Sequence, residues 1–175
     1  TDPDGDRITW DLEYRSVGAT VWRSILSDTP EMLGSWDTSE VTDGRYDLRL
    51  TARDDRDNPH GQAGSSPRSL GPVTIDNTVP VLDGCAVENT ETGFRIRLKA
   101  DDAQGPLAGA MVVLPDGTRE RLDPVDGICD SHHEEWDVEV AWPRRGTISG
   151  PRPGQVEVEV WDLSGNLVRC GGEVR

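Results

Sequence analysis

Hydrophobic and polar residues alternate one by one along much of this chain, which is the pattern of β-strands that bury one face. Apolar side chains occupy every second position from Ile8 to Tyr14 and again from Tyr46 to Ala52. In the first part of the chain we predict five strands, at residues 8–14, 21–26, 33–36, 45–52 and 73–75, with a long polar loop over residues 54–67. Windows with the apolar spacing of a helix are absent from the sequence, so it predicts an all-β protein.

The second part of the chain repeats this organisation. We predict seven strands there, beginning near Leu82 and continuing over residues 94–100, 110–114, 118–122, 136–140, 156–160 and 167–170. The polar segment 77–80 is predicted to be a linker, which gives a first domain over residues 1–76 and a second over residues 81–175. The strand pattern predicts one core from Trp10, Leu12, Tyr46, Leu48 and Leu50, and another from Phe94 or Ile96 with Trp136, Val138 and Val158.

Composition and charge narrow the range of functions. The 175 residues include 33 acidic and 18 basic side chains, for a net charge of −15. An acidic surface repels phosphate groups, so nucleic acid and anionic membrane surfaces are excluded as expected partners. The apolar runs are a few residues long, too short for membrane insertion. Hydrophobic residues make up 34% of the chain, which suits small, thin cores.

The sequence carries no motif that we recognise as catalytic. There is no G-x-S-x-G nucleophile elbow and no glycine-rich phosphate loop before a helix. The three histidines are His60, in a Gly- and Pro-containing loop, and the adjacent pair His132 and His133. We therefore predict a protein that is not an enzyme, with no catalytic residues and no required cofactor.

Two groups of residues remain as candidate binding sites. One is a set of acids within a single loop that also holds Gly127, and its carboxylates could bind calcium: Asp123, Asp126, Asp130 and Glu134. The other is a pair of tryptophans, Trp22 and Trp142, that could stack on sugar rings. Each has a simpler interpretation, because acidic proteins carry acidic loops by chance and tryptophan in a small sandwich usually packs into the core.

Several turn motifs resemble those of the fibronectin type III and bacterial Ig-like domains of secreted proteins. In the first domain they are Asp2-Pro3-Asp4-Gly5-Asp6, Trp36-Asp37-Thr38, Asp43-Gly44-x-Tyr46 and Ile75-Asp76-Asn77-Thr78-Val79-Pro80. In the second they are Pro115-Asp116-Gly117, Asp126-Gly127-Ile128, Asp130-Ser131, Glu135 and Asp162-x-x-Gly165-Asn166. The resemblance implies two tandem Ig-like β-sandwiches, the first lacking its N-terminal strands, which we expect to precede Thr1.

The same resemblance implies a function and a disulfide. It implies a non-catalytic structural, spacer or protein-interaction module of a larger bacterial protein at an extracellular, cell-surface or periplasmic location, with neighbouring domains or other proteins as partners. A carbohydrate-binding accessory module is the alternative. Because the first and last strands of such a sandwich can be adjacent, it also implies a disulfide between Cys85 and Cys170, with Cys129 left over, although three cysteines allow other pairings or none.

Overall fold

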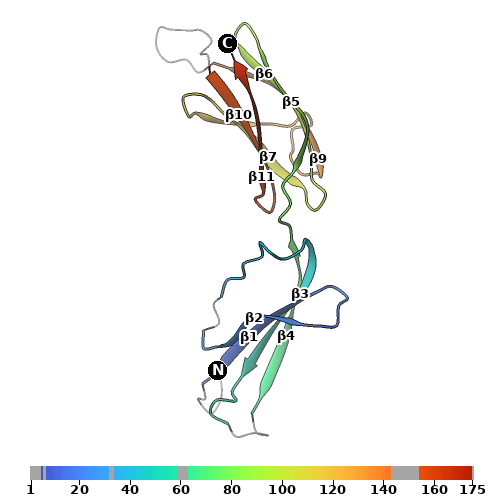
Figure 1. Cartoon of the computed structure of the whole chain (residues 1–175), viewed down its shortest axis with the longest axis vertical. Coiled ribbons are helices and arrows are strands. Elements are labelled where there is room, and N and C mark those ends of the chain that lie inside the picture. The colour runs from blue at the N-terminus through green and yellow to red at the C-terminus, as the bar shows by residue number, and fades with distance from the viewer. Residues whose placement is uncertain (1–4, 6, 32–33, 59–62, 143–153, 175) are drawn as a thin grey trace. The chain divides into compact units, whose positions relative to one another are not determined.

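The computed structural model describes the chain except for residues 1–4, 6, 32–33, 59–62, 143–153 and 175. The described residues form eleven strands, all paired antiparallel, and no helix, which confirms the predicted all-β class. Consequently, no helix in the described part of the chain could span a membrane. The chain forms two compact units, Thr1–Ile75 and Asp76–Arg175, which are called unit 1 and unit 2 below (Figure 1).

In the part of unit 1 that the structure describes, the strands form one four-stranded sheet with the order β2-β1-β3-β4. Its strands are β1 (Thr9–Ser16), β2 (Arg23–Thr29), β3 (Gly44–Arg53) and β4 (Ser65–Ile75). The pairing of β1 with β3 puts Leu12 opposite Leu50 and Glu13 opposite Arg49, as the alternation requires. One side of the sheet is therefore apolar and the other is charged.

The apolar face of unit 1, as the term is used below, consists of Trp10, Leu12, Tyr14, Leu48 and Leu50. All five side chains are only half-buried. Residues 34–43 supply partial cover at one end, where Trp36 lies 4.5 Å from Tyr14, centroid to centroid. Tyr46 is 6% exposed and is the one fully buried member of the predicted first core, so that prediction was wrong for the other four residues.

Two predicted segments of unit 1 differ from the structure. The expected strand at residues 33–36 is not formed, since residues 34–36 lie outside any strand and Leu33 falls outside the described residues. The predicted loop over residues 54–67 is too long, because β4 begins at Ser65 and includes Pro67 and Pro72. Proline lacks a backbone donor, which argued against a strand, but β4 is an edge strand and pairs on one side with β3.

The described residues of unit 2 form two sheets built from seven strands, the number predicted. One sheet has the order β11-β10-β7-β8 and the other β5-β6-β9. The strands are β5 (Val81–Asn89), β6 (Gly93–Asp101), β7 (Leu107–Val113), β8 (Arg119–Leu122), β9 (His133–Ala141), β10 (Gly154–Asp162) and β11 (Leu167–Val174). The boundary between the units, after Ile75, lies one residue before the predicted end of the first domain.

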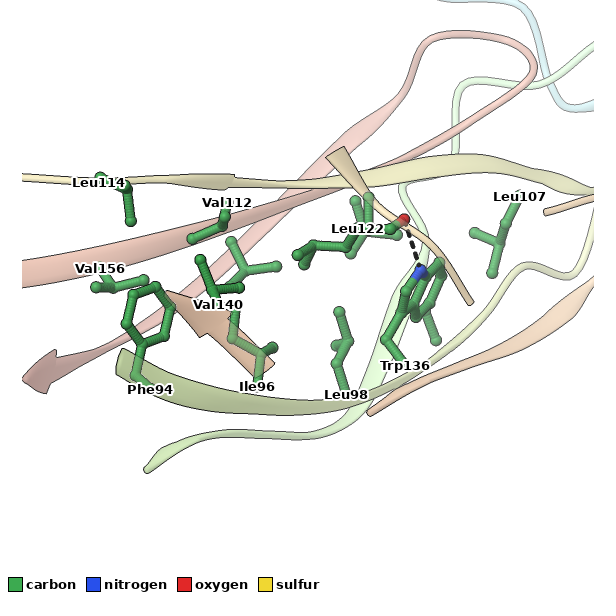
Figure 2. Packing of buried hydrophobic residues seen from close by; sticks show 14 residues of the cluster. Phe94, Ile96, Leu98, Leu107, Val112, Leu114, Leu122, Trp136, Val140 and Val156 are labelled. Carbon is green, nitrogen blue, oxygen red and sulfur yellow. Dashed lines mark hydrogen bonds between the residues drawn. The ribbon is translucent and has the colours of Figure 1, made fainter. Parts of the chain in front are cut away.

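The core of unit 2 lies between its two sheets. Phe94, Ile96 and Leu98 of β6 are each at most 2% exposed, and they pack with Val112 of β7 and Val156 of β10 (Figure 2). Trp136 of β9 is equally buried, and its indole N–H donates to the backbone oxygen of Leu122 over 3.2 Å. The predicted second core is confirmed for Phe94, Ile96, Trp136 and Val158, whereas Val138 is half-buried at its margin.

A disulfide joins the two sheets of unit 2. It links Cys85 on β5 to Cys170 on β11, with the two Cα atoms 6.4 Å apart. This is the pairing that the sequence resemblance implied. Cys129 is the remaining free thiol and is half-buried.

Candidate functional site

Three aspartates from distant parts of unit 2 bring their carboxylates together. Asp76 is the first residue of the unit, Asp102 directly follows β6, and Asp162 is the last residue of β10. One carboxylate oxygen from each lies within 4.8 Å of the corresponding oxygens of the other two. The side chains are buried, at 8%, 5% and 1% exposure respectively. This group is called the aspartate trio below.

Local turns hold Asp102 and Asp162 in place. The Asp102 Oδ1 accepts hydrogen bonds from the backbone N–H groups of Gln104 at 2.8 Å and Gly105 at 2.9 Å. The Asp162 Oδ1 accepts from the backbone N–H of Asn166 at 2.9 Å, and its Oδ2 accepts from the Asn166 side chain at 2.8 Å. These side-chain hydrogen bonds stabilise the turns that follow β6 and β10.

Asn166 connects two of the three segments. Besides its bond to Asp162, its side-chain N–H donates to the backbone oxygen of Asp76 over 3.0 Å. The Ser164 hydroxyl in the same turn lies 3.4 Å from the Asp76 Oδ2. The turn after β10 is therefore hydrogen-bonded to Asp76, the residue at which the chain enters unit 2. Chemically, the trio offers carboxylate oxygens alone, the ligand type preferred by hard cations.

The acidic loop predicted to bind calcium does not converge in this way. Asp123, Asp126 and Asp130 are exposed, whereas Glu134 is 3% exposed. The Glu134 Oε1 accepts from the backbone N–H groups of Asp130 at 3.0 Å and Ser131 at 2.9 Å, so this carboxylate is occupied with its own loop. Among the described residues, the trio is the group in which three potential metal ligands lie close enough to bind one ion. None of the four acids of this loop belongs to it.

The turn motifs of the sequence include Asp76 and Asp162, which we assigned to turn chemistry. Asp102 belongs to none of those motifs, so the trio was not predicted. A partial signal was present, because Asp102 and Asp162 each follow an alternating stretch of the sequence. What the sequence could not supply was the sheet topology that places the three residues at one point.

Cys129 and the adjacent histidines interact with neighbouring loop residues. Burial raises the pKa of the Cys129 thiol to about 11, helped by the negative charge of Glu134. The His132 Nδ1 lies 2.8 Å from the backbone oxygen of Asp102, which fixes the ring against the loop of the trio. A hydrogen bond to Asp101 raises the pKa of His133, which is exposed.

The two tryptophans predicted to stack on sugars lie in different units. In unit 1, the guanidinium groups of Arg15 and Arg49 lie 4.5 and 4.4 Å from the ring centre of Trp22. In unit 2, Trp142 packs on Phe94 with ring centres 5.0 Å apart, at the margin of the core. Both rings are half-buried and already have protein partners.

The charged face of unit 1 is tied together by ion pairs between β1 and β3. Glu13 pairs with Arg49 at 2.7 Å, Asp47 with Arg15 at 3.1 Å and Asp11 with Arg53 at 2.5 Å. A hollow of about 610 Å³ at the end of the sheet is lined by Tyr14, Tyr46, Arg15, Arg23 and Glu40, among others. It shares Tyr14 with the apolar face of unit 1.

The class of protein that the fold defines is all-β, with a sandwich-like second unit. Comparisons with models of protein families, with curated proteins and with solved structures found no match to this chain. The function therefore has to be argued from the surfaces and sites described above.

Proposed function

We propose that this chain is a non-catalytic structural and protein-interaction module, built of two Ig-like units, of a larger extracellular bacterial protein. In this proposal, unit 1 docks a β-sheet layer from a neighbouring domain of the same protein against its apolar face. The observation that carries the proposal is the half-exposure of Trp10, Leu12, Tyr14, Leu48 and Leu50 on a single sheet. Contiguous exposed apolar residues of this kind mark interaction surfaces.

Unit 2 indicates what kind of layer would fit. Its four-stranded sheet is covered by the β5-β6-β9 sheet, and the apolar residues between them are almost completely buried. Complete burial of one large apolar side chain stabilises by about 1.5–3 kcal/mol relative to exposure. Five half-exposed side chains therefore leave several kcal/mol available to a covering layer, and the ion-paired side of the sheet offers no comparable gain.

The disulfide supports the proposed location. Disulfides form and persist in oxidising compartments, and Cys85–Cys170 joins the two sheets of unit 2. The bacterial origin is supported by the resemblance of the turn motifs to bacterial Ig-like domains.

Hydroxyl-radical footprinting tests the docking proposal. The 175-residue chain alone and the larger protein would be oxidised in parallel, and modification would be read at Trp10, Leu12, Leu48 and Leu50. We expect at least about fivefold protection of these four residues in the larger protein, with Val21, which is 70% exposed, modified equally in both. Leu50→Lys should abolish the protection of Trp10, whereas Asp47→Asn on the charged face should preserve it.

Two results would overturn the docking proposal. One is equal modification of the apolar face in both proteins. The other is protection that appears in the isolated chain as its concentration rises, together with a dimer in sedimentation, because the occupant would then be a second copy. The carbohydrate-binding alternative stays a prediction, since the surroundings of Trp22 and Trp142 do not favour it.

A further inference from the structure

We propose that the aspartate trio binds one calcium ion. The first reason is an orphaned atom: the Asp102 Oδ2 is buried and has no hydrogen-bond partner among the described residues. The other oxygen of the same carboxylate accepts two backbone bonds, so the side chain is fixed with its free oxygen inside the protein. A buried, unpartnered carboxylate oxygen is costly, and a bound cation removes that cost.

The second reason is the accumulation of like charge. Three carboxylates lie within 4.8 Å of one another and are each at least 92% buried, given exposures of 8%, 5% and 1%. Neither Asp102 nor Asp162 pairs with a basic side chain in the part of the chain that the structure describes. Buried like charges repel strongly at low dielectric, so the arrangement is favourable when a positive charge lies among them.

The ligand chemistry selects calcium among the common cations. The trio presents carboxylate oxygens and neither thiolate nor imidazole, which disfavours zinc. Two oxygens bound to one Ca²⁺ at about 2.4 Å are at most about 4.8 Å apart, a limit that the trio meets. Mg²⁺ demands shorter, octahedral bonds and tends to keep its water, so a buried set of three side chains suits it less well.

A bound ion would connect three separate segments of unit 2. Asp76 belongs to the entry of unit 2, Asp102 follows β6 of one sheet, and Asp162 ends β10 of the other. A calcium ion held by all three would tie both sheets and the entering chain together at one end of unit 2. Calcium would thus add a crosslink to the one that Cys85–Cys170 provides.

Calorimetric titration of the whole chain, after dialysis against a chelator, tests this inference. We expect one Ca²⁺ per chain, bound at least tenfold more tightly than Mg²⁺. In thermal unfolding, about 10 mM CaCl2 should raise the Tm by at least about 5 °C, because an ion that binds the folded state alone stabilises it by mass action. The absence of calcium-dependent heat and of any Tm shift in the wild-type chain would overturn the proposal, and so would tighter binding of Mg²⁺.

Asp102→Asn is the informative variant. Asparagine keeps an oxygen for the Gln104 and Gly105 N–H groups but removes the charge. We expect calcium affinity to fall at least tenfold. In chelator the variant should match or exceed the wild-type Tm, whereas in calcium it should fall below it. A residue with a purely structural role would lower the Tm equally in both conditions, and that result would contradict the proposal.

The matched control is Asp126→Asn. Asp126 makes the same kind of turn, with its Oδ1 accepting from the Ile128 N–H at 3.1 Å, but it is exposed and outside the trio. The calcium affinity of the Asp126→Asn variant should stay within twofold of that of the wild-type chain. Equal losses in Asp126→Asn and Asp102→Asn would assign binding to general surface charge and refute the site. If Asp102→Asn does not fold, Asp162→Asn serves in its place, and the wild-type titration decides in either case.

Discussion

The central strands of the two units have the same pattern but differ in burial. On β6 in unit 2, Phe94, Ile96, Leu98 and Ala100 are 0–2% exposed. On β3 in unit 1, the corresponding alternate residues from Leu48 onward are half-buried. Alternation therefore specifies which face of a strand is apolar, whereas burial of that face depends on a second layer, which unit 2 has and the described part of unit 1 lacks.

The charged side of the unit 1 sheet also contains buried residues. In unit 1 the best-buried β1 residues are Thr9, at 2%, and Asp11, at 8% exposure. Asp11 accepts from Arg53 and from the backbone N–H of Asp28, so a long side chain and a turn bury this part of the charged side. Burial on the charged side is thus concentrated at Thr9, Asp11 and Thr51, whereas its other charged residues are half-buried or exposed and the apolar face is half-buried.

The largest difference between the units should come from the disulfide. Replacing both Cys85 and Cys170 by Ser removes a crosslink between residues 85 positions apart. Loop-closure entropy predicts a loss of about 4–5 kcal/mol in the free energy of unfolding of unit 2. Denaturant titrations followed by circular dichroism would measure it, with unit 1 as the internal reference. A loss below about 1 kcal/mol, or an equal loss in unit 1, would refute this prediction.

A matched pair of truncations tests whether the two cores differ in how fully they exclude water. Leu98→Ala, at a site 2% exposed, should cost about 2–5 kcal/mol because it leaves a cavity in a closed core. Leu50→Ala, at a half-buried site, should cost about 1 kcal/mol or less because water already reaches the side chain. Both values come from denaturant unfolding of the same chain. Similar costs at the two positions would mean that unit 1 is as closed as unit 2.

The ion pairs provide a smaller contrast. Glu159 of β10 has a side chain 8% exposed and accepts hydrogen bonds from Arg119 and Arg169. Glu159→Gln should cost about 1.5–3 kcal/mol, as expected for charged hydrogen bonds shielded from water. Glu13→Gln in unit 1, where the Glu13 side chain is 25% exposed, should cost about 0.2–1 kcal/mol. Raising the salt concentration should weaken the Glu13 pair more, and the opposite order would contradict the assignment.

The reactivity of the Cys129 thiol reports whether its loop in unit 2 is shielded from solvent. With a pKa of about 11 in place of 9.0, the thiol carries roughly a hundredfold less thiolate at pH 8. Alkylation by iodoacetamide at that pH should be about a hundredfold slower than for an unhindered cysteine, and unfolding in urea should restore the ordinary rate. Fast labelling of the folded chain would mean that this loop is open.

The sequence was most informative where local pattern and packing agree. It predicted the seven strands that the described residues of unit 2 form, from strict alternation in β6, β9 and β10 and from a continuous apolar run in β7. It failed at residues 34–36, where the aromatic ring of Trp36 packs on Tyr14 from a segment outside any strand. It also missed the start of β4 at Ser65, because two prolines are tolerated at a sheet edge.

Candidate sites were harder to predict than strands. Asp123, Asp126, Asp130 and Glu134 are close in sequence, but local hydrogen bonding turns Glu134 inward and leaves the others at the surface. Asp76, Asp102 and Asp162 are far apart in sequence and meet through the sheet topology. Spacing along the chain detects sites within one loop, whereas sites assembled from several strand ends require the fold.

Hydrogen–deuterium exchange of the 175-residue chain tests most directly the claim that unit 2 is closed and unit 1 is open on its apolar side. We expect the amides of β6 and β10 to exchange at least about a hundredfold more slowly than those of β1 and β3, because opening a sheet with a covered core costs more free energy. Equal protection of the central strands in the two units would contradict the account.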